Sequence, residues 1–521
     1  MNLKSLQINH RVVAAIATIT FLALLAIPVQ LAAQEFSAAL KKQPRYRLID
    51  LGTLGGPNSA EFEFPFINNR GVIAGAADTA LPDPNAPDCY DPNCFIIHGF
   101  VWRHGVMNDL GALPGAYNSE AIWNNNNGLT VGQSQNGLMD PLLAFPAAVA
   151  VLWNKNGQIV NLGTLGGYES LAAAINNRGQ IVGGAANSVP DLFPGPLGFL
   201  GTQTRAFLWE QGVMRDIGTL GGPDAFAEFV NQFGQVAGMS YTSFNPNPVL
   251  NFCGQWSVQV PTMDPFLWTN GRMIDLGTLG GTCGVADALN NHGQVVGFSD
   301  LKDDQYLHPF LWPGERGSMT DLGTFGGNFG EAKWLNDRGW VVGWATNPDE
   351  DQHAFFWKDG VMTDLGTVEG DTCSVAKVIN ENGQVVGNSG FGSCDEVHGF
   401  LWQQGQPMID LNIFVPPGSD LQITDAEFIN DQGEITATGM LPNGDFHAIV
   451  LIPCNDERGD GEGCRDVAQN ANGTPTRPAS IAAKSATRPR QNPSERVAGI
   501  RARFVRRYHI PGLGTPRNSK P

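Results

Sequence analysis

Asp275-Leu276-Gly277-Thr278-Leu279-Gly280-Gly281 is the stretch around which this chain is built, because the chain returns to it repeatedly. Close copies begin at Asp50, Asn161, Asp216, Asp321 and Asp364, and looser copies begin at Asp109 and Asp410. A motif that recurs about every fifty residues indicates a repeat architecture, in which each copy belongs to one small structural unit. The repeat therefore has to be interpreted before any single residue is given a chemical role.

The unit at residues 168–222 shows the order of the elements within one repeat. A small apolar segment, 171–175, is followed by the turn Asn176-Asn177-Arg178-Gly179 and a return segment. Asn and Gly supply the positive φ angles that a tight hairpin turn needs. Segments 205–209 and 213–217 form a second hairpin, so that each unit has four short strands. Four-stranded antiparallel sheets whose strands are apolar on both faces are typical of propeller blades.

The number of units follows from the turns. Eight asparagines each stand three residues before a glycine: Asn68, Asn125, Asn176, Asn231, Asn290, Asn336, Asn380 and Asn430. The last unit lacks a fourth strand, whereas residues 46–51 form a fourth strand that has no unit before it. We therefore predict an all-β, eight-bladed propeller over residues 46–454, closed by pairing of this N-terminal strand with the C-terminal blade, which removes two exposed sheet edges. The alternative is an open β-solenoid of eight coils.

The third strand of each unit carries a further motif. It appears as His353-Ala354-Phe355-Phe356-Trp357, with related copies at His98, His398 and His447. Together with the Asp-Leu-Gly-Thr copies, this motif resembles the HAF repeats of predicted extracellular bacterial repeat proteins, over nearly all of residues 46–454. The resemblance implies an exported repeat protein and carries no catalytic residues. Val149, Arg205 and Asp264 stand where the repeat has His, which indicates that this His is not a required ligand.

The two ends of the chain differ from the repeats. Residues 1–33 read as a signal peptide, with basic residues before the apolar run 12–27, and this predicts a secreted or cell-surface protein. An uncleaved membrane anchor is the alternative. Residues 455–491 read as a flexible linker, and residues 492–521 as a basic tail with an amphipathic helix at 493–508. This tail is a candidate for tethering the protein to the cell surface or for docking on its own body, and a solvated tail is the alternative.

Charge limits the choice of partners. The net charge is −18, and eleven Lys or Arg against one acid from Val467 onward give +10, which leaves −28 on the rest of the chain. A body this acidic repels nucleic acid, so we expect no nucleic-acid partner. A glycan or a protein is the expected partner, and the chain is expected to be a monomer.

Eight cysteines agree with export. They fall as sequence neighbours and predict the disulfides Cys89–Cys94, Cys253–Cys283, Cys373–Cys394 and Cys454–Cys464. No paired CxxC spacing is present, so a zinc site is not expected.

Chemically suggestive residues have simpler structural interpretations. The recurrent Asp before Leu-Gly-Thr is expected to accept hydrogen bonds from the amides of the glycine-rich turn, and the strand-end Trp residues to pack between blades. No nucleophile elbow, phosphate loop or zinc motif is present, so we predict a non-catalytic protein without a cofactor. Asp83, Asp88 and Asp91 are weak candidates for Ca²⁺ ligands, with an ordinary polar turn as the alternative.

Loop length points to a functional face. The connection between the second and third strands is long in units one to four, at about 77–97, 134–147, 187–203 and 241–263, and short in the others. Variable loops on a rigid scaffold are where binding usually resides, so we predict a ligand-binding or surface-interaction module that uses this face. The alternative is an extracellular polysaccharide hydrolase or lyase, for which Glu331 and Glu427 are the carboxylates to examine near the centre.

Overall fold

The computed structural model describes most of residues 44–454. It leaves out the short segments 61–64, 87–88, 92, 143–144, 194–196, 198–200, 249–252, 254–258, 315–316 and 393. Several predictions lie outside the described residues: the signal peptide, the linker, the tail helix and the position of Asp88. The predicted Cys454–Cys464 disulfide lies outside them too, because Cys464 is not described. The described residues fall into two units, one of residues 44–47 with 453–454 and one of Leu48–Ile452. Within the first unit, Cys454 N donates to Arg45 O at 2.9 Å.

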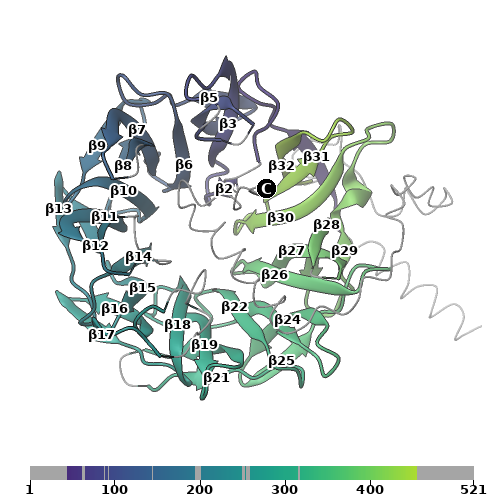
Figure 1. Cartoon of the computed structure of the whole chain (residues 1–521). Helices are drawn as coiled ribbons and strands as arrows, with labels where there is room; N and C mark the ends of the chain where they lie inside the picture. Colours follow the sequence, from purple (N-terminus) through teal and green to yellow (C-terminus); the bar gives the residue numbers. More distant parts are fainter. Residues whose placement is uncertain are drawn as a thin grey trace, which may run out of the picture. The chain divides into compact units, whose positions relative to one another are not determined.

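The described residues form strands and one short 3-10 helix, η1 (Leu411–Phe414). Three four-stranded sheets come first along the chain (Figure 1). The first contains β2 (Phe66–Ile67), β3 (Ile73–Pro82), β4 (Phe95–Arg103) and β5 (Val106–Asp109). The second contains β6 (Ser119–Asn124), β7 (Thr130–Asp140), β8 (Phe145–Trp153) and β9 (Ile159–Gly163). The third contains β10 (Gly166–Ile175), β11 (Ile181–Pro190), β12 (Thr202–Glu210) and β13 (Val213–Asp216).

An eight-stranded sheet follows. One half contains β14 (Ala225–Val230), β15 (Val236–Tyr241), β16 (Met263–Thr269) and β17 (Arg272–Asp275). The other contains β18 (Gly280–Leu289), β19 (Val295–Leu301), β20 (Leu307–Trp312) and β21 (Thr320–Asp321). Each half is an antiparallel meander like the other sheets, and a single parallel pair, Met263 with Cys283, joins the two.

Three more four-stranded sheets complete the fold. One contains β22 (Gly330–Leu335), β23 (Val341–Thr346), β24 (Gln352–Lys358) and β25 (Val361–Asp364). The next contains β26 (Cys373–Ile379), β27 (Gln384–Phe391), β28 (Asp395–Gln403) and β29 (Ile409–Asp410). The last contains β30 (Gln422–Ile429), β31 (Ile435–Met440) and β32 (Phe446–Pro453), with β1 (Tyr46–Asp50) beside β32.

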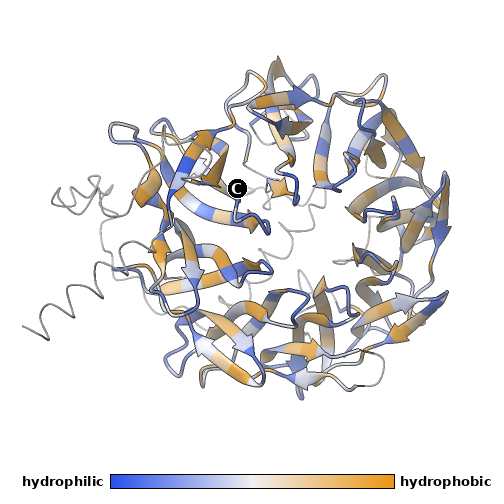
Figure 2. Cartoon of the chain, turned by 180° about the vertical axis from the view of Figure 1, so that it is seen from behind, coloured by the Kyte–Doolittle hydropathy of each residue, from blue (hydrophilic) through white to orange (hydrophobic). Residues whose placement is uncertain are grey.

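Neighbouring sheets pack through small residues on first strands and large residues on third strands. Ala172 on β10 and Phe207 on β12 are completely buried in one such cluster, together with Val131 and Ala150 of the preceding sheet. A large apolar side chain buried as completely as Phe207 contributes about 2 kcal/mol to the hydrophobic driving force. Figure 2 shows the apolar residues on the strands and the hydrophilic residues at the turns.

The glycine in the recurrent Val-Gly of the second strands has a steric cause. A Cβ at Gly297 would lie 1.9 Å from the carbonyl oxygen of Val285, on the neighbouring first strand. Each such first strand is bulged close to this point, for example between Ala286 and Ala288. Only glycine allows the second strand to approach so closely.

The recurrent Asp has the structural role predicted for it. In every copy its side chain accepts a hydrogen bond, 2.7–2.8 Å long, from the backbone N–H two residues later. Asn161 accepts the same bond from Gly163 N, which explains why an amide replaces the acid there. The motif thus forms the end of a fourth strand and the turn that leads to the next sheet.

The turn asparagines link one sheet to the next. In each of the eight turns, Nδ2 of the Asn donates to the backbone oxygen of the corresponding Asn in the following sheet, at 2.8–3.1 Å. The series runs from Asn68 to Asn430, and Asn430 Nδ2 donates back to Asn68 O at 3.0 Å. The same side chains accept bonds within their own turns, as Asn231 Oδ1 does from Phe233 N and Gln235 N.

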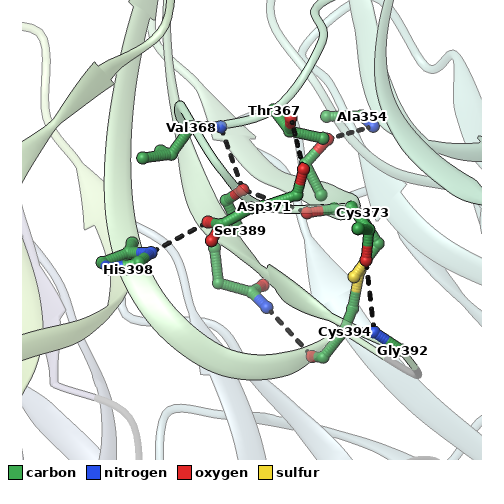
Figure 3. Close-up of a disulfide and its surroundings, with 12 residues drawn as sticks. Ala354, Thr367, Val368, Asp371, Cys373, Ser389, Gly392, Cys394 and His398 are labelled. Carbon is green, nitrogen blue, oxygen red and sulfur yellow. Dashed lines mark hydrogen bonds and ion pairs between the residues drawn. A yellow bond between two sulfur atoms is a disulfide. The ribbon is translucent and has the colours of Figure 1, made fainter. Parts of the chain in front are cut away.

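Three predicted disulfides are confirmed: Cys89–Cys94, Cys253–Cys283 and Cys373–Cys394. Cys253–Cys283 connects the long loop after β15 to the start of β18. Cys373–Cys394 joins β26 to the turn between β27 and β28 (Figure 3). Disulfides are typical of exported proteins, so these three agree with the predicted export. None of the helices in the described part of the chain is long and apolar enough to cross a membrane.

Candidate ligand-binding face

Exposed apolar side chains gather where the second strands of the early sheets end. β3, β7 and β11 continue beyond an irregularity in the ladder to Pro82, Asp140 and Pro190, where they still pair with the third strands of their sheets. Six large apolar side chains on these ends and on the loops that follow, together with Phe244 in the loop after β15, are 47–67% exposed: Leu81, Leu138, Met139, Leu142, Val189, Leu192 and Phe244. We call this set the apolar ridge. Concentrations of exposed apolar side chains mark interaction sites more often than isolated ones do.

Contacts between neighbouring loops hold the ridge in place. Leu142, after β7, lies against Gly201 in the loop of the next sheet, where a Cβ would be 2.8 Å from Leu142 Cδ1. Tyr90, in the first loop, accepts a hydrogen bond from Gln133 Nε2 of β7 at 2.7 Å. These loops are therefore fixed on one another as well as on their own strands.

The Asp83 carboxylate lies in a polar turn. Its oxygens accept four hydrogen bonds of 2.8–3.1 Å, from the backbone and side chain of Asn85, from Tyr90 N and from Asn118 Nδ2. Asp91 accepts from Asn93 N at 2.9 Å. Within the described ranges no group of three or more His, Cys, Asp or Glu is arranged to hold a metal ion. These contacts are those of the polar turn left open as the alternative to a Ca²⁺ site.

Polar side chains at the start of three first strands occupy equivalent positions. Asn118 Oδ1, Glu169 Oε2 and Asp224 Oδ1 each accept a backbone N–H from the third strand of the preceding sheet, at 2.8–2.9 Å. Burial raises the pKa of Glu169 to about 7, with Asp140 adding to the shift. Burial, followed by the charge of Asp191, raises the pKa of Asp224 to about 8. Two acids on the long-loop side are thus protonated for part of the neutral pH range.

Aromatic side chains fill the centre of the first strands. Phe66 and Trp123 stack with ring centroids 3.8 Å apart, and Phe66 also meets Phe428 edge-on at 4.5 Å. The ring centroids of Trp123 and Trp334 are 6.3 Å apart, although these residues belong to sheets far apart in the sequence. Phe229 completes this aromatic cluster. No spacing in the sequence predicted this cluster, because its rings come from the first strands of different units.

The two central carboxylates chosen from the sequence are paired with lysines. Glu331 forms an ion pair with Lys333 and accepts from Trp344 Nε1 at 2.9 Å. Glu427 lies 2.8 Å from Lys377 Nζ, which also pairs with Asp425. The structure does not bring Glu331 and Glu427 together as a pair of free carboxylates of the kind that hydrolysis requires.

The repeated His pairs with the repeated Asp of its own unit. His98–Asp109, His308–Asp321, His353–Asp364 and His447–Asp50 are 2.9–3.0 Å apart, and Arg205–Asp216 replaces the pair in one unit. His398 differs, because it pairs with Asp371 at 2.8 Å beside the Cys373–Cys394 disulfide (Figure 3). The hydrogen bond that His353 donates to Asp364 raises the pKa of His353 above its ordinary value. The sequence analysis did not predict these pairs, although the fixed spacing of the two motifs contained them.

One unit places two acids where the others have a His and an Asp. Asp264 stands in the His position, and burial, together with the charge and hydrogen bond of Asp275, raises the pKa of Asp264 to about 7. Two adjacent carboxylates cannot both ionise cheaply, so they share a proton. Where Val149 stands in this position, the partner is the uncharged Asn161. That unit therefore has neither the His nor the Asp of the pair.

Comparisons with known proteins concern the fold. No family model matches the chain, and no curated protein matches it in sequence, so the resemblance to HAF repeats stays a prediction. The β-propeller domain of the Trilobed protease from Pyrococcus furiosus is similar at 12% identity and a TM-score of 0.36, over 60% of this chain and 85% of that one. The Pyrococcus horikoshii acylaminoacyl peptidase is similar at 12% identity and a TM-score of 0.37, over 65% of this chain and 52% of that one. The Trypanosoma rangeli sialidase is similar at 9% identity and a TM-score of 0.30, over 80% and 60%.

The described architecture is a series of antiparallel four-stranded β-meanders, and the chain spans about half the length of the acylaminoacyl peptidase. The comparisons contradict the prediction of a non-catalytic protein, because a peptidase and a sialidase are among the structures that share this architecture. The physical reason is that a propeller core determines only the scaffold, and loops at its faces carry catalytic groups in some chains and none in others. The missing sequence motifs were therefore no argument against catalysis.

Proposed function

We propose that residues 46–454 form a closed, eight-bladed propeller that is exported and binds an extracellular protein through the apolar ridge. Eight amide hydrogen bonds, one per turn, support the count of eight, and the bond from Asn430 to Asn68 supports closure. β1 lies beside β32, and Leu51 N donates to Ala448 O at 3.0 Å, as a shared last blade requires.

The observation that carries the binding proposal is the exposure of the ridge. Leu138 and Leu192 are 63% and 67% exposed, on loops that contact one another and are fixed to the blades. Aliphatic side chains predominate in the ridge, which favours an apolar protein surface over a glycan, since glycan sites need aromatic platforms and many polar groups. A pre-formed surface also binds without the entropic cost of ordering a loop.

Binding to arrays of extracellular proteins and of glycans tests this proposal. The triple variant Leu81→Ser, Leu138→Ser and Leu192→Ser is expected to lose at least about tenfold in affinity for the protein spots that the parent binds, because apolar anchors carry most interface energy. The matched control is Val106→Ser, Val213→Ser and Val361→Ser, which changes three valines that are 50–63% exposed on fourth strands. Equal loss in both variants, or binding by the parent to glycan spots alone, would contradict the proposal.

A second candidate is a hydrolase or lyase that acts on extracellular polysaccharide. Glu169 supports it, because a carboxyl with a pKa of about 7 on the long-loop side has the protonation of a general acid at neutral pH. Glu169 is only 6% exposed, so a substrate would have to reach it between the loops. Release of reducing ends from a polysaccharide panel is the measurement, and Glu169→Gln is expected to lower that rate at least about a hundredfold. Unchanged release by Glu169→Gln would remove Glu169 from this role.

A further inference from the structure

Three of the eight turns depart from the others at the residue that follows the glycine, where they carry Val72, Leu129 and Trp340. In five of the eight units this residue is Gln180, Gln235, Gln294, Gln384 or Glu434, and its side-chain oxygen accepts from Nδ2 of the turn Asn at 2.6–2.8 Å. In the sixth unit it is Trp340. The indole cannot accept that bond, so the unit gives up a hydrogen bond and gains a partly exposed aromatic surface.

Trp340 forms one wall of a cleft between two sheets. The cleft has a volume of about 330 Å³ and is lined by Trp340 and Phe356 from the sheet of β22–β25 and by Asn382, Gly383, Gln384, Gln403 and Gln404 from the sheet of β26–β29. Trp340 meets Phe356 edge-on at 5.7 Å. Gly383 leaves room for the indole, because a Cβ there would lie 2.9 Å from Trp340 Cζ3.

Two cations lie over the same indole ring. Arg338 Cζ is 4.9 Å and Lys358 Nζ is 4.6 Å from the ring centroid of Trp340. Lys358 is half-buried, and no ion pair joins it to an acid among the residues that the structure describes. Arg338 also acts on Glu381 of the neighbouring turn, whose pKa its charge lowers, whereas burial and the charges of Asp337 and Asp431 raise it. Lys358 is therefore the cation at this ring that is left to attract an anion.

The polar part of the cleft consists of amides. The side chains of Gln403 and Gln404 have no hydrogen-bond partner in the described part of the chain, and Gln404 is exposed. Amide side chains offer a donor and an acceptor together, which suits the hydroxyl groups of a sugar. An aromatic wall, uncommitted amides and a nearby cation are groups that suit an acidic sugar.

We propose that this cleft binds an acidic saccharide, with its carboxylate toward Lys358 beside the cleft, an apolar edge toward Trp340, and its hydroxyls toward Gln403 and Gln404. The site goes beyond the proposed function, because the cleft lies beside the start of a second strand, β23, whereas the apolar ridge follows the ends of second strands β3, β7 and β11. It would add a glycan-binding site to a propeller that holds a protein elsewhere.

Titration calorimetry of the full chain with short galacturonate, alginate and hyaluronan oligosaccharides, and with neutral cello-oligosaccharides of the same lengths, tests the proposal. At least one acidic series is expected to bind at least about tenfold more tightly than the neutral series, and the difference should shrink as salt rises. Absence of binding by all three acidic series, or equal binding of the neutral series, would overturn it.

Two variants separate the cleft from other surfaces. Trp340→Gln restores the residue that four other units carry, so the blade keeps its fold, and it is expected to weaken acidic saccharide binding at least about tenfold. Lys358→Gln should weaken it similarly and leave any neutral binding unchanged. The control Lys155→Gln changes an exposed lysine in a turn of the second unit. Undiminished binding by Trp340→Gln and Lys358→Gln, or equal weakening by Lys155→Gln, would overturn the assignment, and the triple ridge variant should bind the saccharide like the parent.

Discussion

The variant Asp264→His, which introduces the residue that several other units carry at this position, is expected to raise the free energy of unfolding at pH 8 by about 4 kcal/mol. In the parent, Asp264 faces Asp275 and its pKa is raised to about 7 from 3.8. A raised folded-state pKa contributes stability that is complete below the unfolded-state pKa and is lost as the pH rises through the folded value. Each pKa unit corresponds to about 1.4 kcal/mol, so the loss accumulates between pH 4 and pH 8 and amounts to about 4 kcal/mol. A His at this position removes that loss and gives Asp275 the partner that Asp364 has in His353.

The reciprocal variant His353→Asp is the matched control. It places an acid opposite Asp364 and is expected to lower the stability at pH 8 by a comparable amount, with a much smaller effect at pH 4. Urea unfolding of both variants and the parent at pH 4, 6 and 8 is the measurement. Equal effects at pH 4 and pH 8, or a loss of stability in Asp264→His at pH 8, would show that the carboxyl pair is not what limits this unit.

The variants Asn231→Asp and Asn430→Asp are expected to lower the free energy of unfolding by about 3 kcal/mol each at pH 7. The acid keeps the Oδ1 acceptor that the turn uses, but it replaces the donor to the next turn by an oxygen that faces a carbonyl. Leaving a buried carbonyl unsatisfied and placing a charge against it costs about 1–3 kcal/mol or more. Asn430 donates to Asn68, so its variant tests closure of the ring as well as the strength of one link.

Asn154→Asp provides the control for the turn itself. Asn154 Oδ1 accepts hydrogen bonds from Asn156 N and Gln158 N at 2.9 and 3.1 Å, as the eight turn asparagines do in their own turns. Asn154 Nδ2 donates within the same turn, to Gln158 Oε1. Thermal and urea unfolding should therefore show little change in Asn154→Asp. A propeller in which Asn231→Asp is destabilised while Asn430→Asp behaves like Asn154→Asp would be open at its seam.

Much of the fold could be predicted because every unit carries the same motifs in the same order. Asn and Gly predict the hairpin turns, because these turns need positive φ angles, as at Gly179 with a φ of 80°. Three of the predicted disulfides formed between sequence neighbours, because locally closed units bring such cysteines together first. The structural role of the recurrent Asp was also predictable, since Asn161 shares it and a shared role with an amide excludes acid chemistry.

The candidate sites were less predictable, because they depend on which units become neighbours. The long loops could be counted in the sequence, but the exposure of Leu138 and Leu192 depends on how neighbouring loops cover one another. Trp340 is unremarkable in a single unit, and only the packing of two sheets places Asn382 and Gln403 across from it.

The sequence by itself determined the unit, its four strands and the turns between them, because these follow from local backbone preferences and from contacts within one repeat. Tertiary structure alone decided what happens between repeats. It stacks Phe66 on Trp123 and brings Trp334 to them, it joins Asn430 to Asn68, and it opens the cleft beside Trp340. The physical reason is that these contacts join residues from different units, and no periodicity within one unit encodes which side chains will meet across the centre or across a seam.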